Sequence, residues 1–151
     1  MTALTIRNAT IADETRWRDL WQQYLVFYKK QLTEEATAYA WKRIIDPALL
    51  FRCRLAECDG QVVGFAIYFA HESTWENRMV CYLEDLFVDP AARRGGVGRA
   101  LIDDIITSAK ANNWAHVYWQ TDHDNVTARK LYDSYAPSTV VRYLVEVPEI
   151  S

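Results

Sequence analysis

Glycine and cysteine are both scarce in this sequence of 151 residues, which holds five glycines and three cysteines. The cysteines are Cys53, Cys58 and Cys81, an odd number without the two-residue gap of a zinc knuckle. The sequence therefore indicates neither a bound metal nor a disulfide framework, and all three thiols are expected to be reduced.

Long hydrophobic runs are absent as well. No segment approaches the roughly 18 apolar residues of a membrane span, and "MTALTIRNAT" does not read as a signal peptide. Positive charge is not in excess, since 17 Lys and Arg face 20 Asp and Glu for a net charge of −3. The expectation is a soluble, cytoplasmic protein with neither a membrane nor a nucleic acid as partner.

Apolar side chains are plentiful: 50% of the residues are hydrophobic and 13% are aromatic. Such a chain is long enough and apolar enough to fold around a core. It contains no internal repeat, low-complexity tract or linker, so residues 1–151 are expected to form a single domain.

Apolar periodicity and turn signals predict strands and helices in the order β-α-α-β-β-β-α-β-α-β. The strands are expected at residues 3–7, 51–57, 61–70, 79–88, 115–121 and 139–147. The helices are expected from Thr10 to about Tyr28 and at residues 34–45, 97–112 and 125–135. This order predicts an α/β fold of the mixed α+β kind, with helices packed around a central sheet.

The scarce glycines are concentrated between one strand and the next helix, at Gly95, Gly96 and Gly98. A glycine-rich turn that opens a helix points several backbone N–H groups at one spot, where the helix dipole adds positive potential. Three arginines bring further positive charge: Arg93, Arg94 and Arg99. The pattern favours an anion site such as one for phosphate, with a tight turn bearing solvated arginines as the alternative.

Two common phosphate loops do not fit "RRGGVGRAL". A P-loop needs Lys followed by Ser or Thr where this chain has Arg99 and Ala100. A dinucleotide fingerprint needs a third spaced glycine and an opening βαβ unit. What remains is R-x-x-G-x-G, formed by Arg93, Gly96 and Gly98 after the strand "YLEDLFV".

This pattern resembles motif A of the GNAT superfamily, the Gcn5-related N-acetyltransferases. A second segment, "NVTARKLY" from Asn125 to Tyr132, resembles the N-x-x-A-x-x-x-Y segment of the same family. The resemblance extends in element order over nearly the whole chain. It implies acetyl-CoA as cofactor and the GNAT fold, whose central mixed sheet is mostly antiparallel and flanked by helices.

The resemblance also implies roles for the matching residues. The backbone of Leu86, Phe87 and Val88 would hold the pantetheine arm of coenzyme A, with Asn125 nearby. Tyr132 would lie near the thioester sulfur as an acid. The pyrophosphate would be held by Arg93, Arg94, Gly95, Gly96, Val97, Gly98 and Arg99.

Two carboxylates are candidates for the amine side of the reaction, where a protonated amine must lose a proton before attack. Glu84 lies two residues before Leu86 and is the candidate base or amine anchor, acting directly or through water. Asp85 is a candidate for support in substrate binding. Strand alternation predicts that the two point to opposite faces. Each could instead pair with an arginine.

Aromatic side chains suggest a cationic acceptor, because aromatic faces and carboxylates together suit an alkylammonium. Tyr28, Trp75 and Trp119 are the candidates to line its site. The chain is most similar to the Hpa2/Hpa3-type and the diamine and polyamine acetyltransferases, which implies a small primary amine as acceptor and a homodimer. The alternatives are a protein lysine or N-terminal acetyltransferase and a catalytically weak acyl-CoA-binding sensor.

Overall fold

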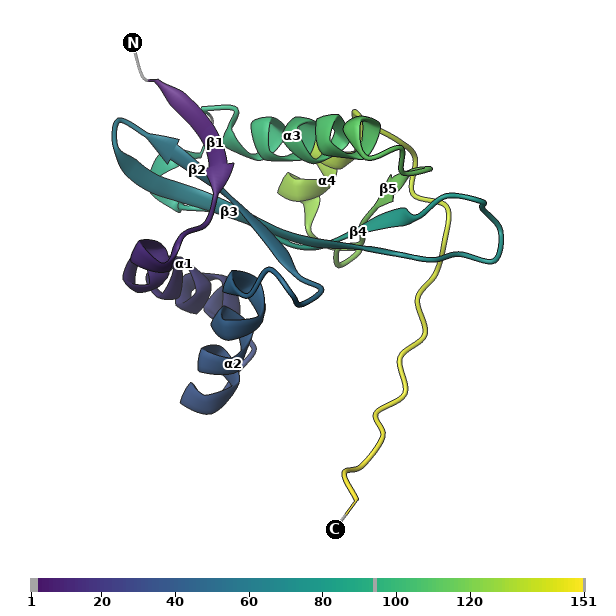
Figure 1. Ribbon diagram of the computed structural model, residues 1–151, viewed down its shortest axis with the longest axis horizontal. Helices are drawn as coiled ribbons and strands as arrows, with labels where there is room; N and C mark the ends of the chain where they lie inside the picture. The colour runs from purple at the N-terminus through teal and green to yellow at the C-terminus, as the bar shows by residue number, and fades with distance from the viewer. Residues whose placement is uncertain (1–2, 94, 151) are drawn as a thin grey trace. The chain divides into compact units, whose positions relative to one another are not determined.

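The described strands form one five-stranded sheet, to which each of them belongs (Figure 1). The structure, a computed structural model, describes residues 3–93 and 95–150. The chain divides into two compact units between Gln120 and Thr121. The strands are β1 (Leu4–Asn8), β2 (Arg52–Cys58), β3 (Gln61–His71), β4 (Val80–Val88) and β5 (Val117–Tyr118). The helices are α1 (Glu14–Phe27), α2 (Glu34–Ile45), α3 (Val97–Ala111) and α4 (Val126–Asp133), with short 3-10 turns η1 (Ile11–Asp13) and η2 (Pro90–Ala92).

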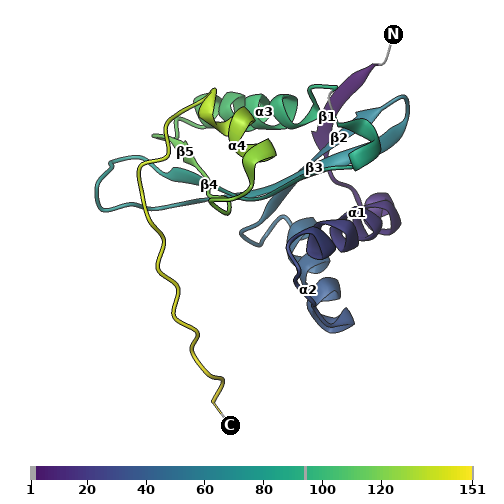
Figure 2. The same ribbon diagram turned by 180° about the vertical axis from the view of Figure 1, so that it is seen from behind.

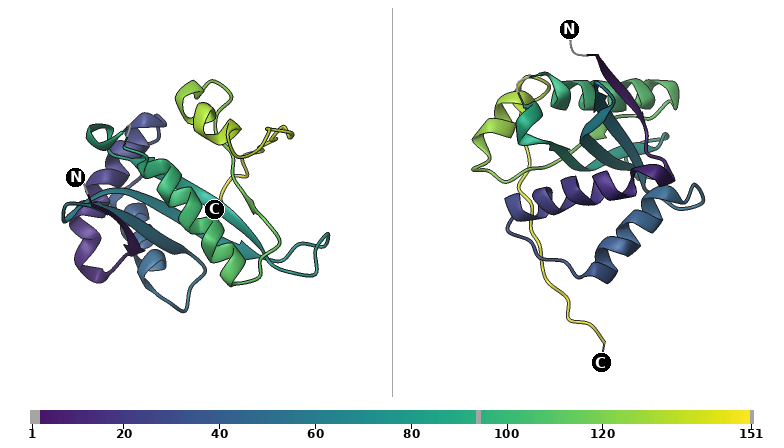
Figure 3. Two further views of the ribbon diagram at one scale, coloured as in Figure 1. Left: turned by 90° about the horizontal axis from the view of Figure 1, so that it is seen from above. Right: turned by 90° about the vertical axis from the view of Figure 1, so that its left-hand side faces the viewer.

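The sheet has the strand order β1-β2-β3-β4-β5, and only the last pairing is parallel. The expected mixed, mostly antiparallel sheet flanked by helices is therefore confirmed. In the first unit, α1 and α2 cover one face of the sheet and α3 covers the other (Figures 2 and 3). We call these the α1 face and the α3 face.

The core of the first unit lies on both faces of the sheet. On the α1 face, Trp17 and Trp21 stack with their ring centroids 5.0 Å apart, and both rings pack against the fully buried Phe65 of β3. On the α3 face, α3 buries one stripe at helical spacing: Val97, Leu101, Ile102 and Ile105. This packing fixes the start of α3 against the sheet, next to the glycine-rich turn.

The second unit contains α4 followed by a segment without helix or strand. The prediction of a last strand at 139–147 is wrong for this structure, and the strand expected at 115–121 is reduced to Val117 and Tyr118. Val140 and Tyr143 are 87% and 91% exposed. Alternating β-branched side chains favour a strand, but a strand also needs a neighbour to bond with, and 139–147 has none in this structure.

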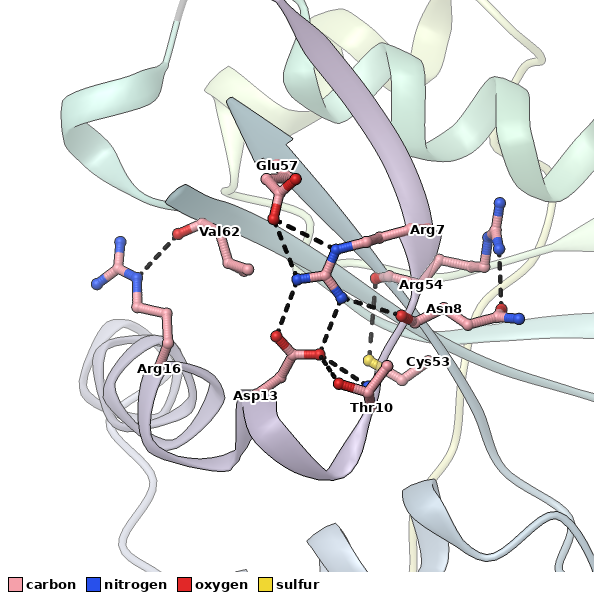
Figure 4. Close-up of polar contacts among 9 residues, drawn as sticks. All are labelled: Arg7, Asn8, Thr10, Asp13, Arg16, Cys53, Arg54, Glu57 and Val62. Carbon is pink, nitrogen blue, oxygen red and sulfur yellow. Dashed lines mark hydrogen bonds and ion pairs between the residues drawn. The ribbon is translucent and has the colours of Figure 1, made fainter. Parts of the chain in front are cut away.

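A polar cluster joins β1, the start of α1 and β2 (Figure 4). Both terminal nitrogens of Arg7 bind the Asp13 carboxylate at 2.9 Å, and Arg7 also binds Glu57. The same carboxylate accepts hydrogen bonds from the backbone N–H and the hydroxyl of Thr10, at 2.7 and 3.0 Å. The hydrogen bond from Arg7 is the main reason that the pKa of Asp13 falls to about 2.

Asp13→Asn is expected to reduce the free energy of unfolding by about 2 kcal/mol at pH 7, because the lowered pKa measures how strongly the fold favours the carboxylate. A carboxyl whose pKa is lower in the folded state contributes stability above its unfolded pKa. That contribution disappears as the pH falls from about 4 to about 2. Urea unfolding at pH 7 and pH 2.5, the latter value roughly inside this window, measures the difference. An equal loss of unfolding free energy at both pH values would contradict the conclusion that the ionised Asp13 stabilises the fold.

Candidate active site

The turn between β4 and α3 exposes the first backbone amides of α3. Gly96 is the N-cap of this helix and has φ +75°, in the left-handed region that favours glycine. The first intrahelical bond runs from the N–H of Ala100 to the carbonyl of Gly96 at 2.9 Å. The amides before Ala100 have no acceptor within the helix, and a glycine has no side chain to cap them. They form a site suited to an anion.

Positive charge lies beside these amides. Arg93 is exposed, its Nε donates to the carbonyl of Val88 at 3.3 Å, and its guanidinium lies 5.8 Å from the centre of the Phe87 ring. Gly95 is exposed next to the N-cap, and Gly98 and Arg99 belong to the first turn of α3. Arg94 lies outside the described residues. The turn thus combines amides that have no acceptor within the helix with an exposed cation, Arg93.

Gly64 allows α3 to approach the sheet, and sequence reasoning missed it. A Cβ on this residue of β3 would lie 2.9 Å from the carbonyl oxygen of Phe87 and 3.3 Å from the side chain of Val97. Any larger residue would push apart β4 and the first turn of α3. A lone glycine in an apolar strand was the available signal, because it marks a close approach of other atoms.

The second half of β4 has no strand beside it on the β5 side. β4 pairs with β3 from Val80 to Val88, whereas β5 pairs only with Cys81 and Tyr82. Among the residues that the structure describes, no strand pairs with the β5 side of Leu86, Phe87 and Val88. Backbone groups along such an edge can bond an extended ligand as a further strand would. The amides of the turn follow directly after this edge.

A β-bulge lies at Glu84, the residue directly before Asp85 in β4. Leu83 pairs with Tyr68 and Asp85 pairs with Ile67, so Glu84 is an extra residue in the strand. Side chains do not alternate strictly at a bulge, so the prediction that Glu84 and Asp85 point to opposite faces does not follow from alternation here. The structure separates them by exposure instead: Glu84 is exposed, whereas Asp85 is half-buried and its carboxylate binds Tyr24 on the α1 face.

Asp85 accepts a hydrogen bond from the hydroxyl of Tyr24 at 2.7 Å, and this contact joins β4 to α1. Burial raises the pKa of Asp85 to about 7, although the hydrogen bond from Tyr24 opposes the shift. Burial next to this carboxylate raises the pKa of Tyr24 as well. Sequence reasoning assigned no role to Tyr24, which lies 61 residues from Asp85.

The expected acceptor residues are spread over the first unit. Tyr28 follows the last residue of α1, and its ring packs edge-on against Tyr24 at 5.0 Å. Trp119 is half-buried and directly follows β5. Trp75 lies in the loop between β3 and β4 and is 93% exposed. Tyr28 is therefore the acceptor candidate with a described contact to Tyr24.

The second unit holds the two remaining candidates. Asn125 is the N-cap of α4; its side-chain amide donates to the hydroxyl of Thr121 at 3.0 Å, and its carbonyl accepts from the N–H of Arg129. Tyr132 is half-buried in the last turn of α4. The predicted helix at 125–135 is confirmed at 126–133.

Comparison with known proteins identifies the class of protein. The Acetyltransferase (GNAT) family model matches residues 15–135, and the chain belongs to this family. It is a member of a family of N-acetyltransferases that use acetyl-CoA. No described helix is long and apolar enough to cross a membrane, and no described group of His, Cys, Asp and Glu could hold a metal ion.

Three similar proteins are informative. The chain is 37% identical over 129 residues to the D-amino-acid N-acetyltransferase HPA3 of Saccharomyces cerevisiae, covering 84% of this chain and 80% of that protein. It is 30% identical over 149 residues to the uncharacterized N-acetyltransferase YhfO of Bacillus subtilis, covering 96% and 99%. The aminoglycoside N-acetyltransferase AAC(6')-Iy in complex with CoA has the same fold, with a TM-score of 0.81, 19% identity and coverage of 99% and 97%.

Proposed function

We propose that this protein transfers the acetyl group of acetyl-CoA to the primary amine of a small molecule, such as a polyamine, a diamine or an amino acid. The observation that carries the proposal is the glycine-capped start of α3 directly after the open edge of β4. A pyrophosphate with an extended arm fits such an arrangement of open amides and free strand edge. The similarity to a D-amino-acid N-acetyltransferase supports a small amine as acceptor.

The residues fit coenzyme A in charge and in shape. Arg93, the amides from Gly95 to Arg99 and, by the family resemblance, Arg94 would hold the pyrophosphate. Leu86, Phe87 and Val88 would hold the pantetheine arm through their backbone, with Asn125 as a further contact. When bound, acetyl-CoA supplies an acetyl group activated as a thioester, and we propose that the amine attacks it directly.

Side chains and backbone groups of this chain would then act on the acceptor amine and on the departing sulfur. Glu84 is exposed on β4, two residues before Leu86, and would meet the acceptor ammonium. A backbone N–H near Leu86 would stabilise negative charge developing on the acyl oxygen. Tyr132 would protonate the departing sulfur through its phenol hydroxyl, acting as a general acid. Tyr28, Asp85, Trp75 and Trp119 are proposed to contact the acceptor.

The proposal is tested by free-thiol release from acetyl-CoA across polyamines, diamines, D- and L-amino acids, aminoglycosides and lysine peptides. We expect sustained turnover with one class of small amine and none with the peptides. Turnover with the lysine peptides alone would identify a protein acetyltransferase. No turnover with any amine, together with calorimetric binding of CoA, would favour an acyl-CoA sensor.

A further inference from the structure

The Asp85 carboxylate accepts a hydrogen bond from Tyr24, whose ring lies among other aromatic rings. The ring of Tyr24 packs edge-on against Phe65 at 5.7 Å, Phe87 at 5.9 Å and Tyr28 at 5.0 Å, and its hydroxyl binds Asp85. Across residues 3–93 and 95–150, no other hydrogen bond and no ion pair reaches this carboxylate. Asp85 therefore has the capacity to bind a further cation or proton.

Among the described residues, the titratable groups that act on Tyr24 and Asp85 bring no positive charge, and Arg54 acts on the neighbouring Cys53. Tyr28 comes from α1 and Glu84 from β4, and Cys53 comes from β2. Cys53 is buried, and this burial is the main cause that raises the pKa of its thiol. The negative charge of the nearby Asp85 raises it further. The charge of Asp85 thus has no cationic partner among these groups, whereas Glu84 is exposed to solvent.

We propose that Asp85, held in place by Tyr24, accepts the proton of the acceptor ammonium, while Glu84 anchors that ammonium from the solvent side. This inference rests on the proposed function and assigns the proton-accepting step within it. Tyr24 is a positioning residue, since it would act through Asp85. The position of Asp85 immediately before Leu86 places the step next to the strand edge proposed to hold the acyl donor.

The protons and electrons of the step balance. One N–H bond of the ammonium breaks, the proton passes to Asp85 and the nitrogen keeps the electron pair. That pair forms the N–C bond to the acetyl group, and the C–S bond breaks with its electrons on sulfur. The nitrogen loses a second proton as the amide forms, and the sulfur gains one. Asp85 then releases its proton to water, which accounts for the one proton that the reaction produces.

A carboxyl that titrates near neutrality is well matched to this task. The pKa of Asp85 is raised to about 7 because removal of the carboxylate from water disfavours its charged form. The equilibrium for proton transfer to such a group from an alkylammonium with a pKa of about 10.4 is unfavourable by a factor of about 10³. For a carboxyl with the ordinary pKa, the factor would be about 10⁶. A base close to the working pH combines the deprotonated form with useful proton affinity.

The test is the pH dependence of kcat and kcat/KM for acetyl transfer in the wild type and in Asp85→Asn, Tyr24→Phe and Glu84→Gln. The wild type should show a rising limb centred near pH 7, following the pKa of Asp85. Asp85→Asn should lose this limb and reduce kcat by roughly 10²-fold or more. Tyr24→Phe should move the limb to higher pH, because the hydroxyl stabilises the carboxylate. Glu84→Gln should raise KM for the amine without moving the limb.

If Tyr24 had only a structural role, Tyr24→Phe would lower the stability of the fold without moving the rising limb of the pH profile. Urea unfolding and calorimetric CoA binding are therefore measured for each variant. A rising limb retained in Asp85→Asn, or lost in Glu84→Gln, would overturn the proposal. A second measurement does not depend on activity: carbon-13 NMR of labelled Asp carboxyls, without acceptor, should show Asp85 titrating near pH 7. An ordinary aspartate value there would overturn the inference even in an active enzyme, whereas an inactive wild type would count against the proposed function.

Discussion

Gly96→Val is expected to weaken CoA binding by at least roughly 100-fold, or about 2.7 kcal/mol. Gly96 is the N-cap of α3 at φ +75°, where a β-branched residue is strained. Relief of that strain would turn the peptide groups of the turn, and the new side chain would stand beside the amides that bind the pyrophosphate. Hydrogen bonds to a charged group contribute about 1.5–3 kcal/mol each, so the loss of two is enough.

Gly60→Val is the matched control for this variant. Gly60 has φ +80° in the turn between β2 and β3, and neither glycine has a heavy atom within 4 Å of a built Cβ. Both variants should therefore lose stability through the same backbone strain, of about 1–2 kcal/mol. Calorimetric titration with CoA separates strain from binding. If both variants bound CoA with equal affinity, the glycine turn would not be the pyrophosphate site.

The features that the sequence predicts correctly depend on residues close together in the chain. Helix α2 was expected at 34–45 and is found there, because Thr33 caps it by accepting from the N–H of Ala36 at 3.1 Å and Pro47 prevents its continuation. The turn before α3 likewise depends on residues that lie close together in the chain. Its glycines, its arginines and the apolar stripe that follows all lie within one segment.

The features that the sequence does not predict depend on contacts between distant segments. The contact of Tyr24 with Asp85 joins residues 61 positions apart, and no local pattern distinguishes Tyr24 from the other aromatics of α1. The bulge at Glu84 is a property of how β4 pairs with β3, and β4 by itself gives no sign of it. The segment 139–147 has the composition of a strand, but composition does not supply the strand that it must pair with.

Tyr132→Phe is expected to reduce kcat by roughly 10²- to 10⁴-fold, the range typical of a general acid, while leaving the affinity for CoA nearly unchanged. The change removes only the hydroxyl and leaves an aromatic ring at this half-buried position in the last turn of α4. A thiolate that leaves without a proton donor departs less readily, and the loss should therefore appear in kcat rather than in KM for the amine.

Tyr135→Phe provides the comparison for this variant, because Tyr135 is also a half-buried tyrosine of the second unit, three residues further on. Steady-state kinetics of the two variants, with CoA affinity measured by calorimetry, separates acid catalysis from an effect on the fold. We expect Tyr135→Phe to retain most of the wild-type kcat. If the two variants lost kcat to the same extent, or if Tyr132→Phe lost none, the departing sulfur would have to obtain its proton from another donor, such as water.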